Sequence, residues 1–318
     1  MIKTLKRPLS TNTQAIQNFF QLVQDKYGGL KPFLHNSNHP KPQNVLTKEH
    51  TFDKHDLIKL TTHEISAIHI KEYYPRDIAK EIGHELSNRI KEAKNWKVGS
   101  SRGLESSDVL TIGKHAPYNV AFAQNNTNAY FDGVLEELRG NRSCNRLYPL
   151  DKLRLELDEV WPSGTGLGRE DDTHRPFGAG LPRIMIGPTR WKHGFIHVDE
   201  LAPLMNTAGL FSANIYLQLP SHNNDGAFQI WPLCIRSRWD WYKNALLLSG
   251  LTVQDPELQV KLRKALGEPY TICVEPGDLV LLCVQRPHAV VGFDEGVRVS
   301  LQCFIQHNGL NERLLIEC

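Results

Sequence analysis

The sequence predicts an α+β protein in which a helical N-terminal half precedes an antiparallel β-sandwich or jelly roll. Apolar residues follow helical spacing in several segments before about residue 180. From Leu181 onward, eight short β-type runs are separated by turn sequences such as Pro276-Gly277-Asp278. Many short strands at such spacing are typical of a double-layered antiparallel sheet.

Residues 1–62 are predicted to form an N-terminal helix and an irregular arm. Residues 13–27 place apolar side chains on one helical face, and Gly28-Gly29 supplies a stop signal. Residues 31–62 are polar, with several His, Asn, Pro and Lys, and predict an irregular surface segment.

Residues 63–180 are predicted to be a helical region that packs on the core, within one continuous domain that begins near residue 63. A strand is expected at 65–70, and Pro75 opens a helix because proline is favoured in a first turn. Two further segments have helical spacing, near 127–139 and 150–160. The glycine-rich stretch 163–180 is either a mobile loop over a site or a linker.

Residues 181–318 are predicted to form the jelly-roll core. The expected strands are at 183–187, 194–199, 211–219, 227–231, 270–275, 279–284, 289–293 and 297–305. A helical insert interrupts them. Its second helix begins at Asp255-Pro256, a good N-cap and first-turn pair, and ends at Gly267.

The composition argues against several classes of protein. The formal net charge is +2 without a basic cluster, so we expect neither nucleic acid nor a membrane as a partner. There is no apolar signal core and no run of about 18 apolar residues that could span a membrane. The six cysteines form no CxxC pair. We therefore expect a cytoplasmic protein without a disulfide framework or a thiolate zinc site, and leave its oligomeric state open.

His197-Val198-Asp199 is the first part of a candidate metal site. Residues i and i+2 of a strand project to one face, so His197 and Asp199 point together. Two imidazoles and one carboxylate can cap one face of iron(II) and leave the other face open, and His288 is the candidate third ligand. About one such triplet is expected by chance in a chain of this size, so a hydrogen-bonded strand histidine is the alternative for His197.

The last predicted strand alternates apolar and polar side chains. Its polar face carries Arg298, Ser300 and Gln302. A short hairpin through Asp294-Glu295-Gly296 is expected to fold this strand beside the one that follows His288, which would place Arg298 near that histidine. An inward arginine can grip a carboxylate with two parallel N–H bonds, and a nearby hydroxyl adds a third donor. The alternative is that this face is simply exposed to solvent.

The order HxD, a distant histidine, and an arginine ten residues later with a serine two further on resembles the iron(II)/2-oxoglutarate-dependent dioxygenase superfamily. The resemblance covers about residues 181–305 and implies a double-stranded β-helix, which is a jelly roll. The iron ligands that it implies are His197, Asp199 and His288. It also implies that Arg298 and Ser300 bind the distal carboxylate of 2-oxoglutarate, with Arg286 or Arg236 as the alternative clamp.

Two further residues are candidates for cofactor binding. Asn214 and Tyr216 lie on the strand after HxD, where inward residues of relatives touch the co-substrate or the substrate. The alternative for Tyr216 is a half-buried aromatic of the barrel. Trp231, on the next strand, is expected to pack in the core.

The resemblance implies an oxygenase that uses iron(II), 2-oxoglutarate and O2 and releases succinate and CO2. The helical half and the HGFIHVDE segment resemble free-standing oxygenases of natural-product pathways. Halogenation is disfavoured because halogenases of this superfamily have a small residue in place of Asp199. The expected reaction is hydroxylation of an unactivated C–H bond in a small molecule, such as an amino acid or specialised metabolite. A protein side-chain hydroxylase and a non-catalytic binding module are the alternatives, and desaturation, ring closure, substrate and stereochemistry stay open.

Overall fold

The computed structural model describes residues 45–100, 103–113, 116–139, 147–178, 180–199, 209–221, 225–234, 251 and 254–317. The helix expected at 13–27 lies outside these residues, as does the first part of the predicted arm. Among the described helices, none combines the length and the apolar character that a membrane-spanning helix requires.

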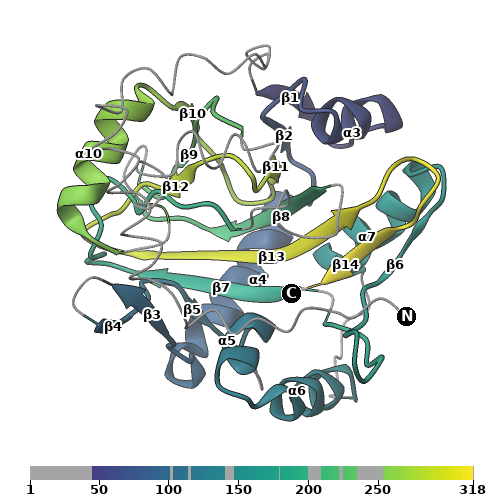
Figure 1. The fold of residues 1–318 in the computed structure, drawn as a ribbon, viewed down its shortest axis with the longest axis horizontal. Helices are drawn as coiled ribbons and strands as arrows, with labels where there is room; N and C mark the ends of the chain where they lie inside the picture. Colours follow the sequence, from purple (N-terminus) through teal and green to yellow (C-terminus); the bar gives the residue numbers. More distant parts are fainter. Residues whose placement is uncertain are drawn as a thin grey trace, which may run out of the picture.

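Two antiparallel β-layers form the centre of the fold (Figure 1). The large layer contains four adjacent core strands, β7 (Leu181–Ile186), β13 (Val297–His307), β8 (Gly209–Gln218) and β11 (Leu279–Cys283). The small layer contains β10 (Tyr270–Ile272), β9 (Phe228–Ile230) and β12 (His288–Val290). A single bridge between His197 and His288 extends the small layer. The chain passes back and forth between these layers, which confirms the α+β jelly-roll core.

Additional strands widen the large layer on both edges. On the β11 side they are β2 (Ala67–Lys71) and β1 (Leu46–Glu49). On the β13 side they are β14 (Leu314–Glu317), β6 (Thr165–Leu167) and, paired with β7, β5 (Leu110–Thr111). A separate hairpin is formed by β3 (Lys97–Ser100) and β4 (Gly103–Ser106).

The predicted irregular arm is wrong for residues 46–61, which form β1 and helix α3 (Lys54–Thr61). Asp53 begins the helix because its carboxylate accepts the backbone N–H groups of His55 and Asp56. In turn, the Asp56 carboxylate accepts a hydrogen bond from the backbone N–H of Asp53, which completes a capping box. Leu57 and Leu60 are buried, so two apolar residues anchor an otherwise polar segment.

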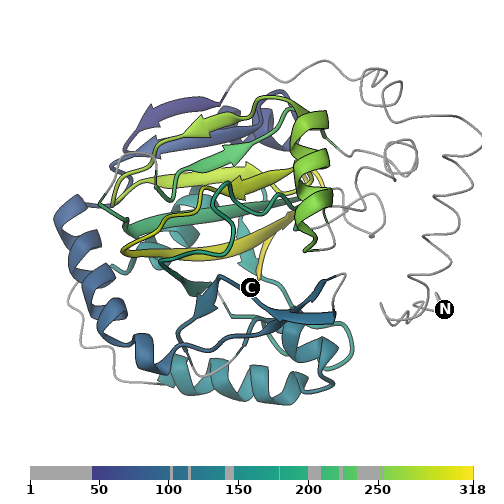
Figure 2. The same ribbon diagram turned by 90° about the vertical axis from the view of Figure 1, so that its left-hand side faces the viewer.

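Helices cover the outer faces of both layers. Helix α4 (Arg76–Asn88) packs on β8 so closely that a Cβ on Gly83 would lie 2.9 Å from the carbonyl oxygen of Leu217. Helix α7 (Pro149–Val160) adds Leu153 and Leu157 to the same core. Helix α10 (Pro256–Leu266) packs on the small layer, and α4 and α10 lie on opposite sides of the strands in Figure 2. The remaining helical elements are the 3-10 turn η1 (Ile90–Glu92), α5 (Tyr118–Ala123) and α6 (Thr127–Arg139).

These helices confirm the predictions made from Pro75, from residues 127–139 and 150–160, and from Asp255-Pro256. Trp231 is buried against Leu262 of α10, and its indole N–H donates to the carbonyl of Gly267, as expected of a core residue.

Two other expectations need correction. Residues 194–199 do not form a strand, because only His197 makes a ladder-type pair. The stretch 163–180 is neither a free loop nor a linker over its described residues. It contributes β6 to the large sheet, and Phe177 packs 4.8 Å from the ring of Tyr118. Periodicity could not detect these contacts because they join distant segments.

The polar face of β13 points into the space between the two layers. Val299, Leu301 and Cys303 belong to the outer core beneath the helices. Arg298 and Ser300 face the opposite way and are buried at 4% and 1% exposure. The solvent-exposed alternative is therefore wrong for Arg298 and Ser300, whereas Gln302, farther along the same face, is only partly buried.

Candidate metal centre

His197, Asp199 and His288 converge at one end of the small layer. Their ligand atoms all lie within 4.8 Å of one another. The Nε2 atom of His197 is 3.5 Å from Asp199 Oδ1, and the Nε2 atom of His288 is 3.2 Å from Asp199 Oδ2. The side chain of His288 is 5% exposed and that of Asp199 is 20% exposed, so the site opens on one side. The structure thus brings together all three predicted ligands.

Backbone carbonyls orient both imidazole rings. The Nδ1 atom of His197 lies 3.0 Å from the carbonyl oxygen of Phe195, and the Nδ1 atom of His288 lies 2.8 Å from that of Arg286. A carbonyl can only accept, so each Nδ1 carries the proton. In the neutral rings this leaves the lone pair on Nε2, which is the atom that faces Asp199.

The segment that carries His197 is held from two sides. On one side, the backbone of His197 pairs with the backbone of His288. On the other side, Gln259 of α10 donates to the carbonyl of Ile196 at 2.9 Å and accepts its N–H at 2.8 Å. The side-chain amide therefore replaces a neighbouring strand for Ile196.

The charges of the site are coupled. Although burial opposes ionisation, the imidazoles of His288 and His197 hold the pKa of Asp199 well below its usual range. Burial would lower the pKa of His197, but hydrogen bonding to Asp199 raises it overall. An ionised carboxylate between two imidazole nitrogens is an arrangement that also attracts a cation.

The donor set fits a metal ion with open coordination positions. Two imidazole nitrogens and one carboxylate oxygen form the facial triad of non-haem iron(II) oxygenases. Three protein ligands leave room for small-molecule ligands on the remaining positions.

Arg298 and Ser300 present polar atoms that lack hydrogen-bond partners among the described residues. These atoms are Arg298 Nε and Ser300 Oγ, and Tyr216 Oη has the same status. The Arg298 guanidinium lies over the Tyr216 ring, 5.0 Å from its centroid, and Ser300 pairs with Tyr216 across β13 and β8. A buried cation with nearby unsatisfied donors fits an anionic ligand such as a carboxylate.

This polar group connects to the metal ligands through the interior. Tyr216 packs in the same apolar cluster as Phe228, and the Phe228 ring lies 5.6 Å from the ring of His288. Gly226, in the turn before β9, has a φ of 72°, and a Cβ there would lie 3.1 Å from the Arg298 side chain. Glycine suits this position because it adopts the positive φ without strain and leaves space for the Arg298 side chain.

The two further candidates for cofactor binding, Asn214 and Tyr216, lie in different surroundings. Tyr216 is in contact with Arg298, whereas the Asn214 amide donates to Ser212 Oγ at 2.9 Å, farther along the same inward face. Arg286 is occupied by the backbone carbonyls of Pro232 and His63. Arg236 lies outside the described residues. Sequence reasoning missed Gln259, for which no local pattern was available.

Comparison with known proteins gives structural neighbours only. No protein-family model and no curated protein matches the chain. An N-substituted L-amino acid dioxygenase from Burkholderia ambifaria AMMD, solved with alpha-KG, shares 12% identity over 83% of this chain and 91% of its own, with a TM-score of 0.49. A 2OG-Fe(II) oxygenase family oxidoreductase from Burkholderia pseudomallei shares 12% identity over 85% and 99%, with a TM-score of 0.41.

A third solved structure is SnoN, a non-heme alpha ketoglutarate dependent epimerase from nogalamycin biosynthesis. It shares 11% identity over 80% of this chain and 87% of its own, with a TM-score of 0.40. The names of all three proteins refer to 2-oxoglutarate, under that name or as alpha ketoglutarate. The roles of individual residues rest on the geometry of this chain.

Proposed function

We propose that the protein is an iron(II)- and 2-oxoglutarate-dependent oxygenase that hydroxylates an unactivated C–H bond of a small molecule. The observation that carries the proposal is the convergence of His197, Asp199 and His288, with both Nδ1 atoms tied to backbone carbonyls. When bound, iron(II) would supply the activation of O2 that couples decarboxylation of 2-oxoglutarate to substrate oxidation.

The protein's own residues would place the reactants. His197, Asp199 and His288 would hold the metal on one face. Arg298 would pair with the distal carboxylate of 2-oxoglutarate, and the Ser300 hydroxyl would donate to the same group. Burial of the arginine beneath Tyr216 strengthens such a pair because little water competes for it.

A small substrate is favoured over a protein side chain by two features. The sequence shows no charged stripe of the kind that a peptide groove often has. In addition, α10 packs against the segment that leads to His197, where Arg263 donates to the carbonyls of His193 and Gly194, so a helical insert lies beside the site as expected for an enzyme of small molecules.

The test is anaerobic titration with iron(II) and 2-oxoglutarate, followed by a metabolite library. Binding should produce a metal-to-ligand charge-transfer band, a true substrate should perturb it, and air should then yield succinate. Product mass distinguishes the reactions, because hydroxylation adds one oxygen, desaturation removes two hydrogens, and epimerisation leaves the mass unchanged. Absence of the band at saturating iron(II) and 2-oxoglutarate would refute the proposal.

A further inference from the structure

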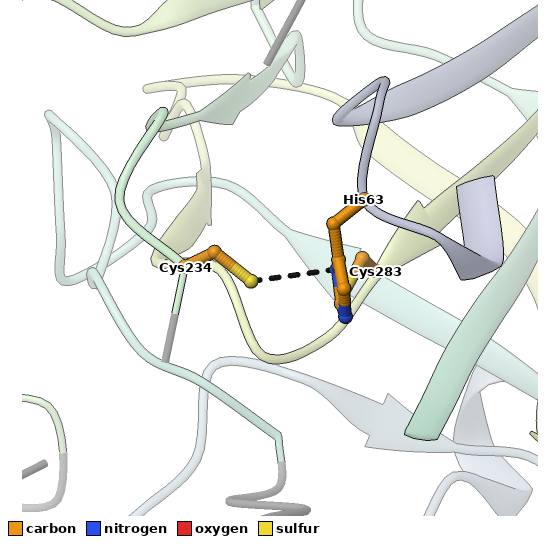
Figure 3. Close-up of side chains that lie close together, drawn as sticks. All are labelled: His63, Cys234 and Cys283. Atoms are coloured by element: carbon orange, nitrogen blue, oxygen red, sulfur yellow. Dashed lines mark hydrogen bonds between the residues drawn. The ribbon is translucent and has the colours of Figure 1, made fainter. Parts of the chain in front are cut away.

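A second group of ligand-type side chains shares no residue with the first. His63 follows α3, Cys234 follows β9, and Cys283 ends β11 (Figure 3). The Nδ1 atom of His63 is 3.4 Å from the sulfur of Cys234 and 3.3 Å from that of Cys283. All three ligand atoms lie within 4.8 Å of one another. We call this group the Cys2His cluster.

We propose that the Cys2His cluster is a second metal site, which binds a thiophilic divalent ion such as Zn²⁺. A tetrahedral zinc ion with bonds of about 2.3 Å to sulfur and 2.0 Å to nitrogen separates neighbouring sulfur and nitrogen ligands by about 3.5 Å. The two observed nitrogen-to-sulfur distances, 3.3 Å and 3.4 Å, are close to that ligand separation. The ligands therefore already stand near the spacing that the ion requires.

Hydrogen bonding alone explains this arrangement poorly. An imidazole Nδ1 has either one proton or one in-plane lone pair. It can make one good hydrogen bond, yet two sulfur atoms lie within 3.4 Å of it. A metal ion satisfies all three atoms at once, because each would direct one lone pair at the same point.

The ligand side chains lie in the interior, next to a buried cation. Cys234 and Cys283 are buried, at 8% and 3% exposure. The fully buried guanidinium of Arg286 donates to the carbonyls of His63 and Pro232, next to the two ligand segments. Two thiolates and one divalent ion sum to zero charge, so the bound ion would leave no net charge on the three buried groups. Each bound ion would release about two protons from the thiols to solvent.

The proposed ion would connect three parts of the fold. It would join the α3 segment, the end of β9 and the end of β11. Arg286, which bridges the ligand segments of the Cys2His cluster, also presents the carbonyl that orients His288. The second site would therefore stiffen the loop that carries a ligand of the first. The described residues supply three ligands, so a fourth position is open to water or to a further donor.

The direct test is titration of the reduced full-length protein with Co²⁺. Of the two ligand groups that the described residues form, only the Cys2His cluster has sulfur ligands. A thiolate-to-cobalt charge-transfer band therefore reports this site even while the His-Asp-His site also binds cobalt. We expect the band to saturate and to be abolished by Zn²⁺. In the Asp199→Ala protein, saturation should need about one equivalent.

Variants assign the ligands. Cys234→Ser and Cys283→Ser should each lower the band and weaken Co²⁺ binding at least tenfold, with far-ultraviolet circular dichroism to verify folding. Cys273→Ser is the matched control, because Cys273 is exposed and outside the cluster, and it should keep the band. A reduced wild-type protein that binds Co²⁺ without any thiolate band overturns the proposal, as does a Cys234–Cys283 disulfide in protein isolated with Zn²⁺ present.

Discussion

His197 and His288 exchange both of their backbone hydrogen bonds, at 3.0 Å and 2.9 Å, and no described neighbour of His197 continues this ladder. The pair fixes the separation of two metal ligands through the main chain. Carbonyls two residues earlier then fix both rings, whose centroids are 4.4 Å apart. The main chain thus sets the relative position of the two imidazoles, and Asp199 completes the group.

Removal of the carboxylate should abolish the metal site. Asp199→Ala leaves two nitrogen ligands and no negative charge. Loss of a residue that only hydrogen-bonds to a metal ligand lowers metal affinity by up to about 100-fold, so loss of the ligand itself should lower iron(II) affinity by more than that. Equilibrium dialysis under anaerobic conditions measures this, and succinate production should cease. Asp294→Ala, in the exposed hairpin before β13, is the control. Unchanged succinate production by Asp199→Ala would contradict the assignment.

Loss of the buried guanidinium should weaken binding of the co-substrate. A hydrogen bond to a charged group contributes about 1.5–3 kcal/mol, so Arg298→Leu should raise the KM for 2-oxoglutarate about 10- to 150-fold. Arg298→Lys should lie between this variant and wild type because lysine lacks the paired donors. The iron(II) affinity of Arg298→Leu in the absence of 2-oxoglutarate should equal that of wild type. Arg89→Leu, at an exposed position, is the control and should leave the KM unchanged. An unaltered KM in Arg298→Leu would show that another residue holds the carboxylate.

The site was easier to predict than parts of the fold. His197, Asp199, His288 and Arg298 follow a fixed order, and strand parity places Arg298 and Ser300 on the inward face of β13. His197 and Asp199 converge although their segment is not a strand. Elsewhere, contacts between distant segments determine the local structure, and the alternation of side chains along a strand cannot predict them. Two leucines hold α3 within a polar segment. Gln259 takes the place of a neighbouring strand for Ile196, within the segment 194–199 where local periodicity predicts a strand that does not form. The domain boundaries near residues 63 and 181 stay predictions.

The cysteines show the limit most clearly. The absence of a CxxC pair led us to expect no thiolate zinc site. Cys234, Cys283 and His63 meet because β9, β11 and the α3 segment end at the same place in the fold. Ligands that come from three distant segments leave no spacing pattern in the sequence, so only the folded chain reveals them.

A side chain at Gly194 should disturb the segment that leads to His197. Gly194 has a φ of 80°, and a Cβ there would lie 2.3 Å from the carbonyl oxygen of Val290 in β12. Gly267→Ala is the matched control, because its φ is 74° but nothing lies within 4 Å of the added Cβ. Backbone strain costs about 1–3 kcal/mol in both variants. Gly194→Ala should lose more stability in urea unfolding and should alone weaken iron(II) binding. Equal effects of the two variants would argue against this close approach.

Ionisation of Glu317 should destabilise the fold at neutral pH. Burial raises the pKa of Glu317 above its ordinary 4.5, although Gln306 donates to the carboxylate. The folded state therefore holds this proton more tightly than the unfolded state, and the stability so gained is lost as pH rises through the folded pKa. Glu317→Gln stays neutral and keeps an acceptor for Gln306. Its urea midpoint should exceed that of wild type at pH 7, and the gain should vanish below pH 4.5. The exposed Glu312→Gln is the control, and a lower midpoint for Glu317→Gln at pH 7 would refute the prediction.

Gln259 should be a positioning residue for the metal centre. Its amide makes both hydrogen bonds to the backbone of Ile196, which immediately precedes His197. Gln259→Leu leaves a buried N–H and a buried carbonyl without these partners, at a cost of about 1–3 kcal/mol for each group. Gln259→Glu should be milder, because the neutral acid that burial favours accepts the N–H with one oxygen and donates its O–H to the carbonyl with the other. The exposed Val260→Ala, one residue along α10, should have little effect.

A purely structural role for Gln259 would lower the urea midpoint and leave iron(II) affinity of the folded protein unchanged. A positioning role lowers both, because Ile196 fixes where the next residue presents its imidazole. We therefore expect the ranking wild type, Gln259→Glu, Gln259→Leu in iron(II) affinity, measured well below each midpoint. The same ranking should appear in unfolding, since the same two backbone groups determine both quantities. Wild-type iron affinity in a destabilised Gln259→Leu protein would separate the two roles and would show that the His197–His288 pair alone positions the ligand.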